Sequence, residues 1–279
     1  MRGTVPERPA RRHVSRTSLR GARTILRLVV QPPLPPNAPP DLGPRLRAVR
    51  LIARGGMGVV WEAHDLERDR PCAVKLLGPG PAPPEVARRF EREAAVADHL
   101  SGHDGIVAAH AAGVTPGGQP FLVMELVRGD TLEDLIDEGA LSRADAVVVV
   151  RDVARAVAFA HARGVVHRDL KPSNVLVDDA GRARLLDYGV AKLEATLGPA
   201  LTATGDRLGS PCYMAPEQID DAKRVDARSD VYGLGALLYQ ALVREPPYDG
   251  QTVLEILRKV VEGRLVPPRE KDATVDAEL

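Results

Sequence analysis

The sequence has little of what marks secreted, membrane-spanning or strongly charged proteins. Only two of its 279 residues are cysteines, too few for a disulfide framework, so we expect a reducing, cytoplasmic setting. Lys plus Arg equals Asp plus Glu at 38 each, which gives no overall electrostatic argument for a nucleic-acid or membrane partner. The best apolar segment, residues 25–30, is interrupted by Arg27 and is far shorter than the roughly 20 residues of a membrane span.

Acidic residues are almost missing from the first 30 residues, which contain eight arginines but only Glu7 of opposite charge. Residues 31–44 then contain seven prolines. Proline removes backbone donors and favours extended polyproline geometry. The composition therefore predicts a disordered, basic and Pro-rich tail over residues 1–44, followed by a folded domain over residues 45–279.

From residue 45 the apolar pattern becomes that of a globular domain. Short apolar runs predict strands, and longer runs with helical spacing predict helices. The strands are expected at residues 49–52, 59–63, 72–77 and 121–126, and the helices at residues 84–100 and 144–163. A sheet comes first in the chain, and the helices follow.

The segment His167-Arg168-Asp169-Leu170-Lys171-Pro172-Ser173-Asn174 is followed thirteen residues later by Asp187-Tyr188-Gly189. Transfer of a phosphoryl group from ATP depends on positioning and charge neutralisation, and these side chains can supply a proton acceptor, a cation and metal ligands. The two motifs resemble the catalytic loop, H-R-D-L-K-x-x-N, and the metal loop, D-F-G, of the eukaryotic-like (Hanks-type) protein kinases, so we use these names for residues 167–174 and for the segment that begins at Asp187. The resemblance implies an α+β, two-lobed protein-kinase fold with a sheet-based N-lobe (residues 45–127) and a helical C-lobe (residues 128–279).

The same resemblance implies a role for each side chain of the two motifs. Asp169 would accept the proton of a substrate hydroxyl, and Lys171 would neutralise charge on the transferred group. Asn174 and Asp187 would bind Mg²⁺, which prefers oxygen ligands. The position of Lys171 is typical of serine/threonine rather than tyrosine kinases, whereas His167 would only pack beneath the metal loop.

A glycine cluster at residues 52–60 resembles the family's phosphate-binding loop, with Ala53 in place of its first glycine. Gly55, Gly56 and Gly58 would let the backbone approach the phosphates. We expect Ala53 to weaken ATP binding without abolishing it, provided that its φ is negative.

Lys75, in the third predicted strand, matches the lysine that holds the α- and β-phosphates, and it needs a carboxylate to orient it. Glu91 and Glu93 would point about 200° apart around the helix, so only one can face Lys75. The neighbouring Phe90, the apolar residues 94–96 and the family's R-F-x-x-E phrase favour Glu93 as the partner. The adenine pocket implied by the resemblance could equally consist of ordinary core residues: Val60, Ala73, Met124, Glu125, Val127 and Leu176. Ile52, at the start of the glycine cluster, is also expected to contact the nucleotide.

Between Asp187 and Ala215-Pro216-Glu217 lies a stretch that resembles an activation loop. Thr202 and Thr204 resemble the autophosphorylated pair of bacterial kinases of this class, and Arg168, assisted by Lys192, would bind such a phosphate. The alternative is that both threonines are ordinary polar loop residues. Asp230 matches the buried aspartate that anchors the catalytic loop.

The chain ends where the family continues into its last helices and the arginine that pairs with Glu217, so we expect an incomplete C-lobe. The resemblance implies ATP and Mg²⁺ as cofactors, protein Ser/Thr substrates, and self-association that would allow phosphorylation between copies. The alternative is a nucleotide-binding pseudokinase, scaffold or inactive truncated product. A small-molecule kinase is less consistent with the peptide-positioning residues 209–211.

Overall fold

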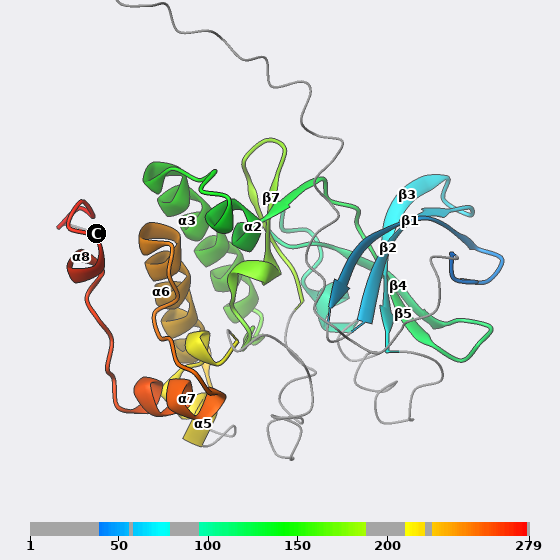
Figure 1. Ribbon diagram of the computed structural model, residues 1–279. Coiled ribbons are helices and arrows are strands. Elements are labelled where there is room, and N and C mark those ends of the chain that lie inside the picture. Colours follow the sequence, from blue (N-terminus) through cyan, green and yellow to red (C-terminus); the bar gives the residue numbers. More distant parts are fainter. Residues whose placement is uncertain (1–38, 56–57, 79–94, 188–209, 221–224, 278–279) are drawn as a thin grey trace, which may run out of the picture. The chain divides into compact units, whose positions relative to one another are not determined.

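The first part of the folded chain is an antiparallel sheet with the strand order β1-β2-β3-β5-β4 (Figure 1). The computed structural model describes residues 39–55, 58–78, 95–187, 210–220 and 225–277. The strands are β1 (Leu46–Gly55), β2 (Gly58–Asp65), β3 (Arg70–Leu77), β4 (Ala109–Val114) and β5 (Pro120–Met124). Each of the four predicted strands is present, and residues 95–99 form the described end of the helix predicted over residues 84–100.

The sheet carries a separate apolar cluster on each face, because successive side chains along a strand point to opposite sides. Along β3, Cys72, Val74 and Leu76 belong to one cluster, and Ala73 belongs to the other with Met124. Lys75 therefore lies on the same side of the strand as Ala73. This alternation places the single buried lysine of β3 on the side that faces the second part of the fold.

The first of these clusters extends beyond the expected start of the folded domain. Leu42 is 4% exposed and packs in the cluster that contains Leu46, Trp61 and Phe121. The unit that begins at residue 39 therefore includes part of the Pro-rich stretch. The remainder of the predicted tail, residues 1–38, lies outside the described residues.

The second part of the fold combines a three-stranded sheet with helices, as the two-lobed prediction requires. The sheet has the order β6-β7-β8, with β6 at Gly129–Thr131, β7 at Val175–Asp178 and β8 at Ala183–Leu185. The helices are α2 (Leu132–Asp137), α3 (Arg143–His161), η1 (Pro172–Asn174), η3 (Ser210–Tyr213), α5 (Pro216–Asp220), α6 (Ala227–Val243), α7 (Val253–Val261) and α8 (Pro268–Lys271).

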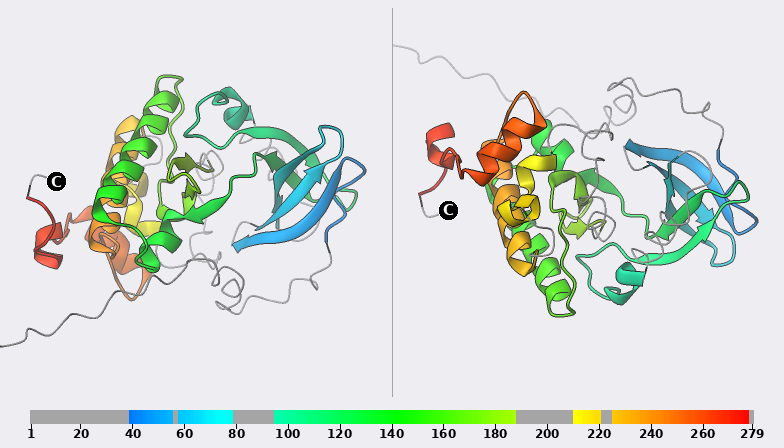
Figure 2. Two further views of the ribbon diagram at one scale, coloured as in Figure 1. Left: turned by 90° about the horizontal axis from the view of Figure 1, so that it is seen from above. Right: turned by 90° about the horizontal axis from the view of Figure 1, so that it is seen from below.

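Helices α3 and α6 lie side by side and share the largest apolar core with β7 and β8 (Figures 1 and 2). Ser142 caps the N-terminus of α3 and Asp226 that of α6, and each side chain accepts a hydrogen bond from a backbone N–H of the first turn. The capped end of α6 is the one that approaches the catalytic loop, whereas α3 approaches it with its opposite end, at His161.

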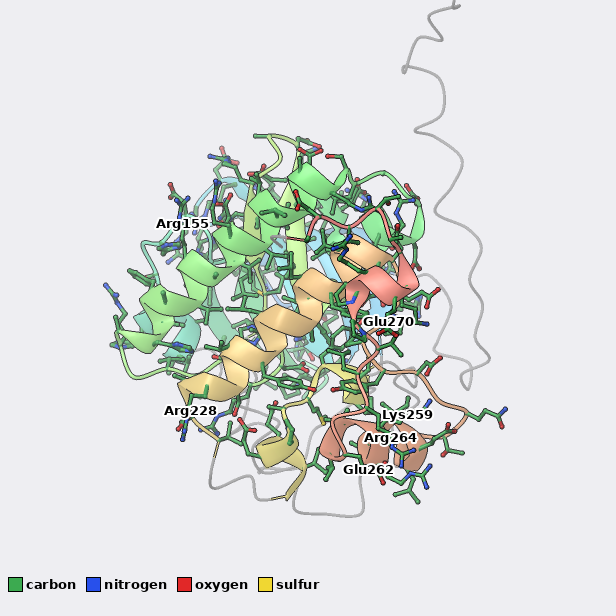
Figure 3. All side chains as sticks on the ribbon, turned by 90° about the vertical axis from the view of Figure 1, so that its left-hand side faces the viewer. Arg155, Arg228, Lys259, Glu262, Arg264 and Glu270 are labelled. Carbon is green, nitrogen blue, oxygen red and sulfur yellow. The ribbon has the colours of Figure 1, made fainter. Side chains whose placement is uncertain are left out.

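The last described residues pack back against this pair of helices (Figure 3). The Tyr239 hydroxyl donates to the Val266 carbonyl at 2.9 Å, Arg143 pairs with Asp272, and Val275 is 4% exposed. Among the described helices, none combines the length and apolar character needed to cross a bilayer.

Candidate active site

Lys75 reaches the site from the middle of β3. Its side chain is only 10% exposed, and its Nζ lies 2.6 Å from Asp187 Oδ2. A buried ammonium group must be paired, because its desolvation would otherwise cost several kcal/mol. The ion pair thus brings the predicted phosphate-binding lysine and a predicted metal ligand together, although 112 residues separate them.

Asp169 lies in the loop before η1, next to the other groups that the motif predicted. Asn174 Nδ2 donates to both the backbone carbonyl of Asp169, at 2.8 Å, and its Oδ2, at 3.1 Å. Lys171 Nζ is 3.6 Å from the same Oδ2. A carboxylate, an amide and an ammonium group therefore converge where the sequence predicted proton transfer and charge neutralisation.

The catalytic loop is held from beneath by Asp230 in the first turn of α6. Its carboxylate accepts hydrogen bonds from the backbone N–H groups of His167 and Arg168, both at 2.8 Å, and lies 2.7 Å from His161 Nε2. The predicted anchoring role of Asp230 is confirmed. Arg168 has a φ of 67°, a left-handed conformation that costs on the order of 1–3 kcal/mol for such a residue.

His167 is fully buried and links the catalytic loop to the metal loop. Its Nε2 lies 3.0 Å from the Leu186 carbonyl, and its Nδ1 lies 3.3 Å from the Asp169 backbone N–H. One neutral tautomer satisfies both bonds, with Nε2–H as donor and Nδ1 as acceptor. Burial lowers the pKa of His167 and so favours this neutral form, which confirms the predicted packing role.

The two predicted metal ligands fit Mg²⁺ in their chemistry. The Asn174 amide uses its nitrogen for Asp169, which leaves its carbonyl oxygen as the atom suited to a cation. The Asn174 backbone carbonyl also accepts from Leu186 N–H at 2.8 Å, which ties it to the residue before Asp187. The described residues contain no group of three His, Cys, Asp or Glu side chains arranged around a metal. Mg²⁺ commonly needs only one or two carboxylates, with phosphates and waters completing its shell.

The strands β1 and β2 meet at the glycine cluster, where Gly55 pairs with Gly58. Gly58 has a φ of 140°, and a Cβ there would lie 1.9 Å from the Leu76 carbonyl, so contact with β3 requires glycine. Packing against β3 is thus a second reason for glycine at this position, besides the predicted close approach of the backbone to the phosphates. Ala53 is not among the described residues with a positive φ, so the condition set for nucleotide binding is met.

Several predicted adenine-pocket residues gather on one face of the sheet. Val60 and Val127 pack against the cluster of Ala73 and Met124. Ile52 lies in β1 and is 37% exposed, and Leu176 lies in β7 opposite Thr131. A cavity of only about 20 Å³ lies behind Met124, so this side of the pocket is nearly filled.

Glu125 has only one backbone group available for a hydrogen bond to adenine. Its backbone N–H already donates to the Ala108 carbonyl at 2.9 Å, which leaves its carbonyl oxygen. Its side chain pairs with Arg184 of β8, a partner that the motifs did not reveal.

Other predicted residues fall outside the described part of the chain: Gly56, Glu93, Lys192, Thr202 and Thr204. Glu217, which was expected without the family's arginine, accepts a hydrogen bond from the Ser229 hydroxyl at 2.6 Å. Sequence reasoning also missed Gln218, which contacts the catalytic loop directly. A signal was present, since Gln218 stands three residues after Ala215, the residue just before α5, at the position where a side chain can cap the helix.

The model of the protein kinase domain family matches residues 46–277, and the chain therefore belongs to the protein kinase family. The match confirms the resemblance to Hanks-type kinases and the two-lobed fold. The chain is 37% identical over 248 residues to the serine/threonine-protein kinase PknB of Mycolicibacterium smegmatis. That alignment covers 87% of this chain and 39% of the relative.

PknB of Mycobacterium tuberculosis matches with the same identity and the same coverage. PknD of Mycobacterium tuberculosis is 39% identical over 237 residues, which cover 83% of this chain and 34% of that relative. The chain thus spans about two fifths of the length of the PknB relatives that it matches.

Proposed function

We propose that this chain is a serine/threonine protein kinase that uses ATP and Mg²⁺. The observation that carries the proposal is the convergence of Lys75 with Asp187 and of Asp169 with Lys171 and Asn174. When bound, Mg·ATP supplies the phosphoryl group and much of the charge neutralisation. The names of the mycobacterial relatives support serine and threonine as acceptors.

The side chains divide the work of the reaction between them. Asp169 Oδ2 orients the acceptor hydroxyl and takes up its proton, while Asn174 Nδ2 fixes the direction of that carboxylate. Lys171 places positive charge beside Asp169, where the transferred group would pass. Lys75 holds phosphate oxygens from the β3 side, and Asn174 and Asp187 provide oxygen ligands for the cation.

Activation by phosphorylation of the chain on Thr202 and Thr204 is part of the proposal. Arg168, directly before Asp169, would bind the phosphate with help from Lys192, since a phosphothreonine carries roughly −1.5 to −2 charges near neutral pH. One copy would phosphorylate another, which requires transient self-association. Proteins are the proposed substrates, because the segment around Ala215 resembles the peptide-positioning region of the family.

The test uses the whole 279-residue chain with Mg²⁺ and γ-labelled ATP, beside an Asp169→Asn variant. We expect label on the wild type, mapped by mass spectrometry to Thr202 or Thr204, and none on the variant. A folded wild type that binds nucleotide and transfers no label to itself or to peptides would instead identify a pseudokinase.

The activation step has its own test. A Thr202→Ala, Thr204→Ala double variant is expected to phosphorylate a serine peptide far more slowly than the wild type. Full activity of that variant would refute activation at these two threonines and leave the catalytic assignment standing.

A further inference from the structure

Gln218, in the first turn of α5, connects two segments of the site through one side-chain amide. Its Oε1 accepts a hydrogen bond from the Ala215 backbone N–H at 2.9 Å. Its Nε2 donates to the Arg168 carbonyl at 2.8 Å, across 50 residues of sequence. Ala215 belongs to the segment that would receive the peptide, and Arg168 directly precedes the catalytic Asp169.

The two contacts require opposite polarity, so they fix the orientation of the amide. The bond to Ala215 needs an acceptor, and the bond to Arg168 needs a donor. The first is the usual capping bond that a Gln or Glu at the third helical position makes to the backbone N–H of the residue just before the helix. The second is not needed for capping, and glutamate, which caps equally well, could not make it when ionised.

The hydrogen bond to the Arg168 carbonyl matters for the loop, because Arg168 has an unfavourable left-handed backbone conformation with a φ of 67° that neighbouring contacts must hold. On one side its N–H donates to Asp230 Oδ1 at 2.8 Å, and on the other its carbonyl accepts from Gln218. The two peptide groups that flank Arg168 are thus held by hydrogen bonds from side chains of α6 and of α5. A shift of the second peptide group would move the Asp169 backbone with it.

We propose that Gln218 is a positioning residue for catalysis, which holds the Arg168–Asp169 peptide in register with the peptide-binding segment. The inference rests on the proposed kinase function and adds a residue to it. Gln218 touches neither nucleotide nor acceptor in this role. Its effect is therefore expected on the turnover number kcat, and not on the binding of ATP or peptide.

The test compares Gln218→Glu and Gln218→Met with the wild type in the full chain. Gln218→Glu keeps the cap to Ala215 and loses the donor to Arg168, whereas Gln218→Met loses both bonds at similar volume. Gln251→Glu is the matched control, because Gln251 lies on the exposed surface before α7. We measure kcat and KM for peptide and for ATP, together with the thermal midpoint of unfolding.

Both Gln218 variants are expected to lower kcat about tenfold or more with each KM nearly unchanged, since small misplacements of catalytic groups have effects of this size. Only Gln218→Met should also lower the thermal midpoint. Wild-type kcat in Gln218→Glu would overturn the inference and reduce Gln218 to a helix cap. A wild type without any transfer would overturn the proposed function, and this inference with it.

Discussion

The two sides of the site hold their functional groups by different means. On the N-lobe side, Lys75 is placed by a strand that is bonded along both edges, to β2 and to β5. On the C-lobe side, Asp169 lies in a loop whose backbone is fixed by buried side chains from α6 and from the loop itself. The direction of a side chain on a strand is set by the interstrand hydrogen bonds and by the apolar packing of the sheet. The loop depends instead on a few hydrogen bonds from buried side chains to its backbone, which we call clamps.

The comparison predicts that loss of a clamp costs both stability and activity. Asp230→Ala leaves the buried N–H groups of His167 and Arg168 without their acceptor, and such losses cost about 3–5 kcal/mol when the partner is charged. Urea unfolding should show this decrease in the free energy of unfolding, together with loss of phosphoryl transfer. Asp226→Ala, which removes only the half-exposed cap of the same helix, is the control: it should lower the free energy of unfolding far less than Asp230→Ala does and keep full activity. A stable and active Asp230→Ala chain would break the comparison.

Loss of the strand-held group should act on activity alone. Lys75→Met removes the cation that faces the phosphates and is expected to lower kcat/KM about 100-fold, or about 2.7 kcal/mol. The free energy of unfolding should change little, because Asp187 is 29% exposed and remains hydrated. Lys259→Met, on α7, is the matched control with wild-type kinetics. Unfolding of Lys75→Met to the same extent as Asp230→Ala would refute the distinction.

The N-lobe has one charged clamp of its own, far from the chemistry. Asp65 is 1% exposed and accepts from Arg45 Nη2 at 2.7 Å and from the backbone N–H groups of Glu67 and Arg68. The hydrogen bond from Arg45 is the main cause of a pKa of Asp65 well below its ordinary value. The clamp joins the start of β1 to the end of β2.

Asp65→Asn should therefore lower the free energy of unfolding by about 2–3 kcal/mol at neutral pH, with the kinetics unchanged. Because the folded pKa is lowered, this stability is complete above about pH 4 and is lost as pH falls through the folded pKa. Urea titrations at several pH values should show the difference between wild type and variant shrinking in acid. A difference that stays constant with pH would contradict the assignment.

The smallest expected effect concerns His167, whose pKa is lowered mainly by burial. The unfolded chain then binds a proton that the folded chain does not, so stability decreases as pH falls below about 6.5. The slope contributed by His167 approaches about 1.4 kcal/mol per pH unit at most. Comparing wild type with His167→Asn between pH 5 and 7, roughly the range over which histidine titrates, should show a flatter profile for the variant. Parallel profiles would mean that His167 takes up its proton equally in the folded and the unfolded chain, and would contradict this assignment.

The same contrast explains what the sequence could predict. Strand positions were predictable because Cys72, Val74 and Leu76 alternate with Lys75, and the motifs located Asp169, Asn174 and Asp187. Asp230 was found through its motif, although nothing in its local pattern shows a buried aspartate. Contacts between residues far apart in the sequence, such as Gln218 with Arg168, produce no periodic pattern from which they could be predicted.

The sequence was less informative where the same local pattern is compatible with two different structures. Proline-rich residues 39–44 suit a free linker and also an extended segment that packs Leu42 against the sheet. Glu217 looked unpartnered because the motif names only an arginine, whereas a serine hydroxyl at the start of α6 reaches it. In both cases the tertiary contact, and not the local sequence, decides the outcome.

The most direct test of the account is a crystal structure of this chain with Mg²⁺ and a non-hydrolysable ATP analogue. The account predicts Lys75 Nζ on the phosphates, Asn174 and Asp187 oxygens on the cation, and the Asp169 carboxylate open toward the terminal phosphate. A nucleotide bound elsewhere, or a Lys75–Asp187 ion pair that excludes the phosphates, would contradict it.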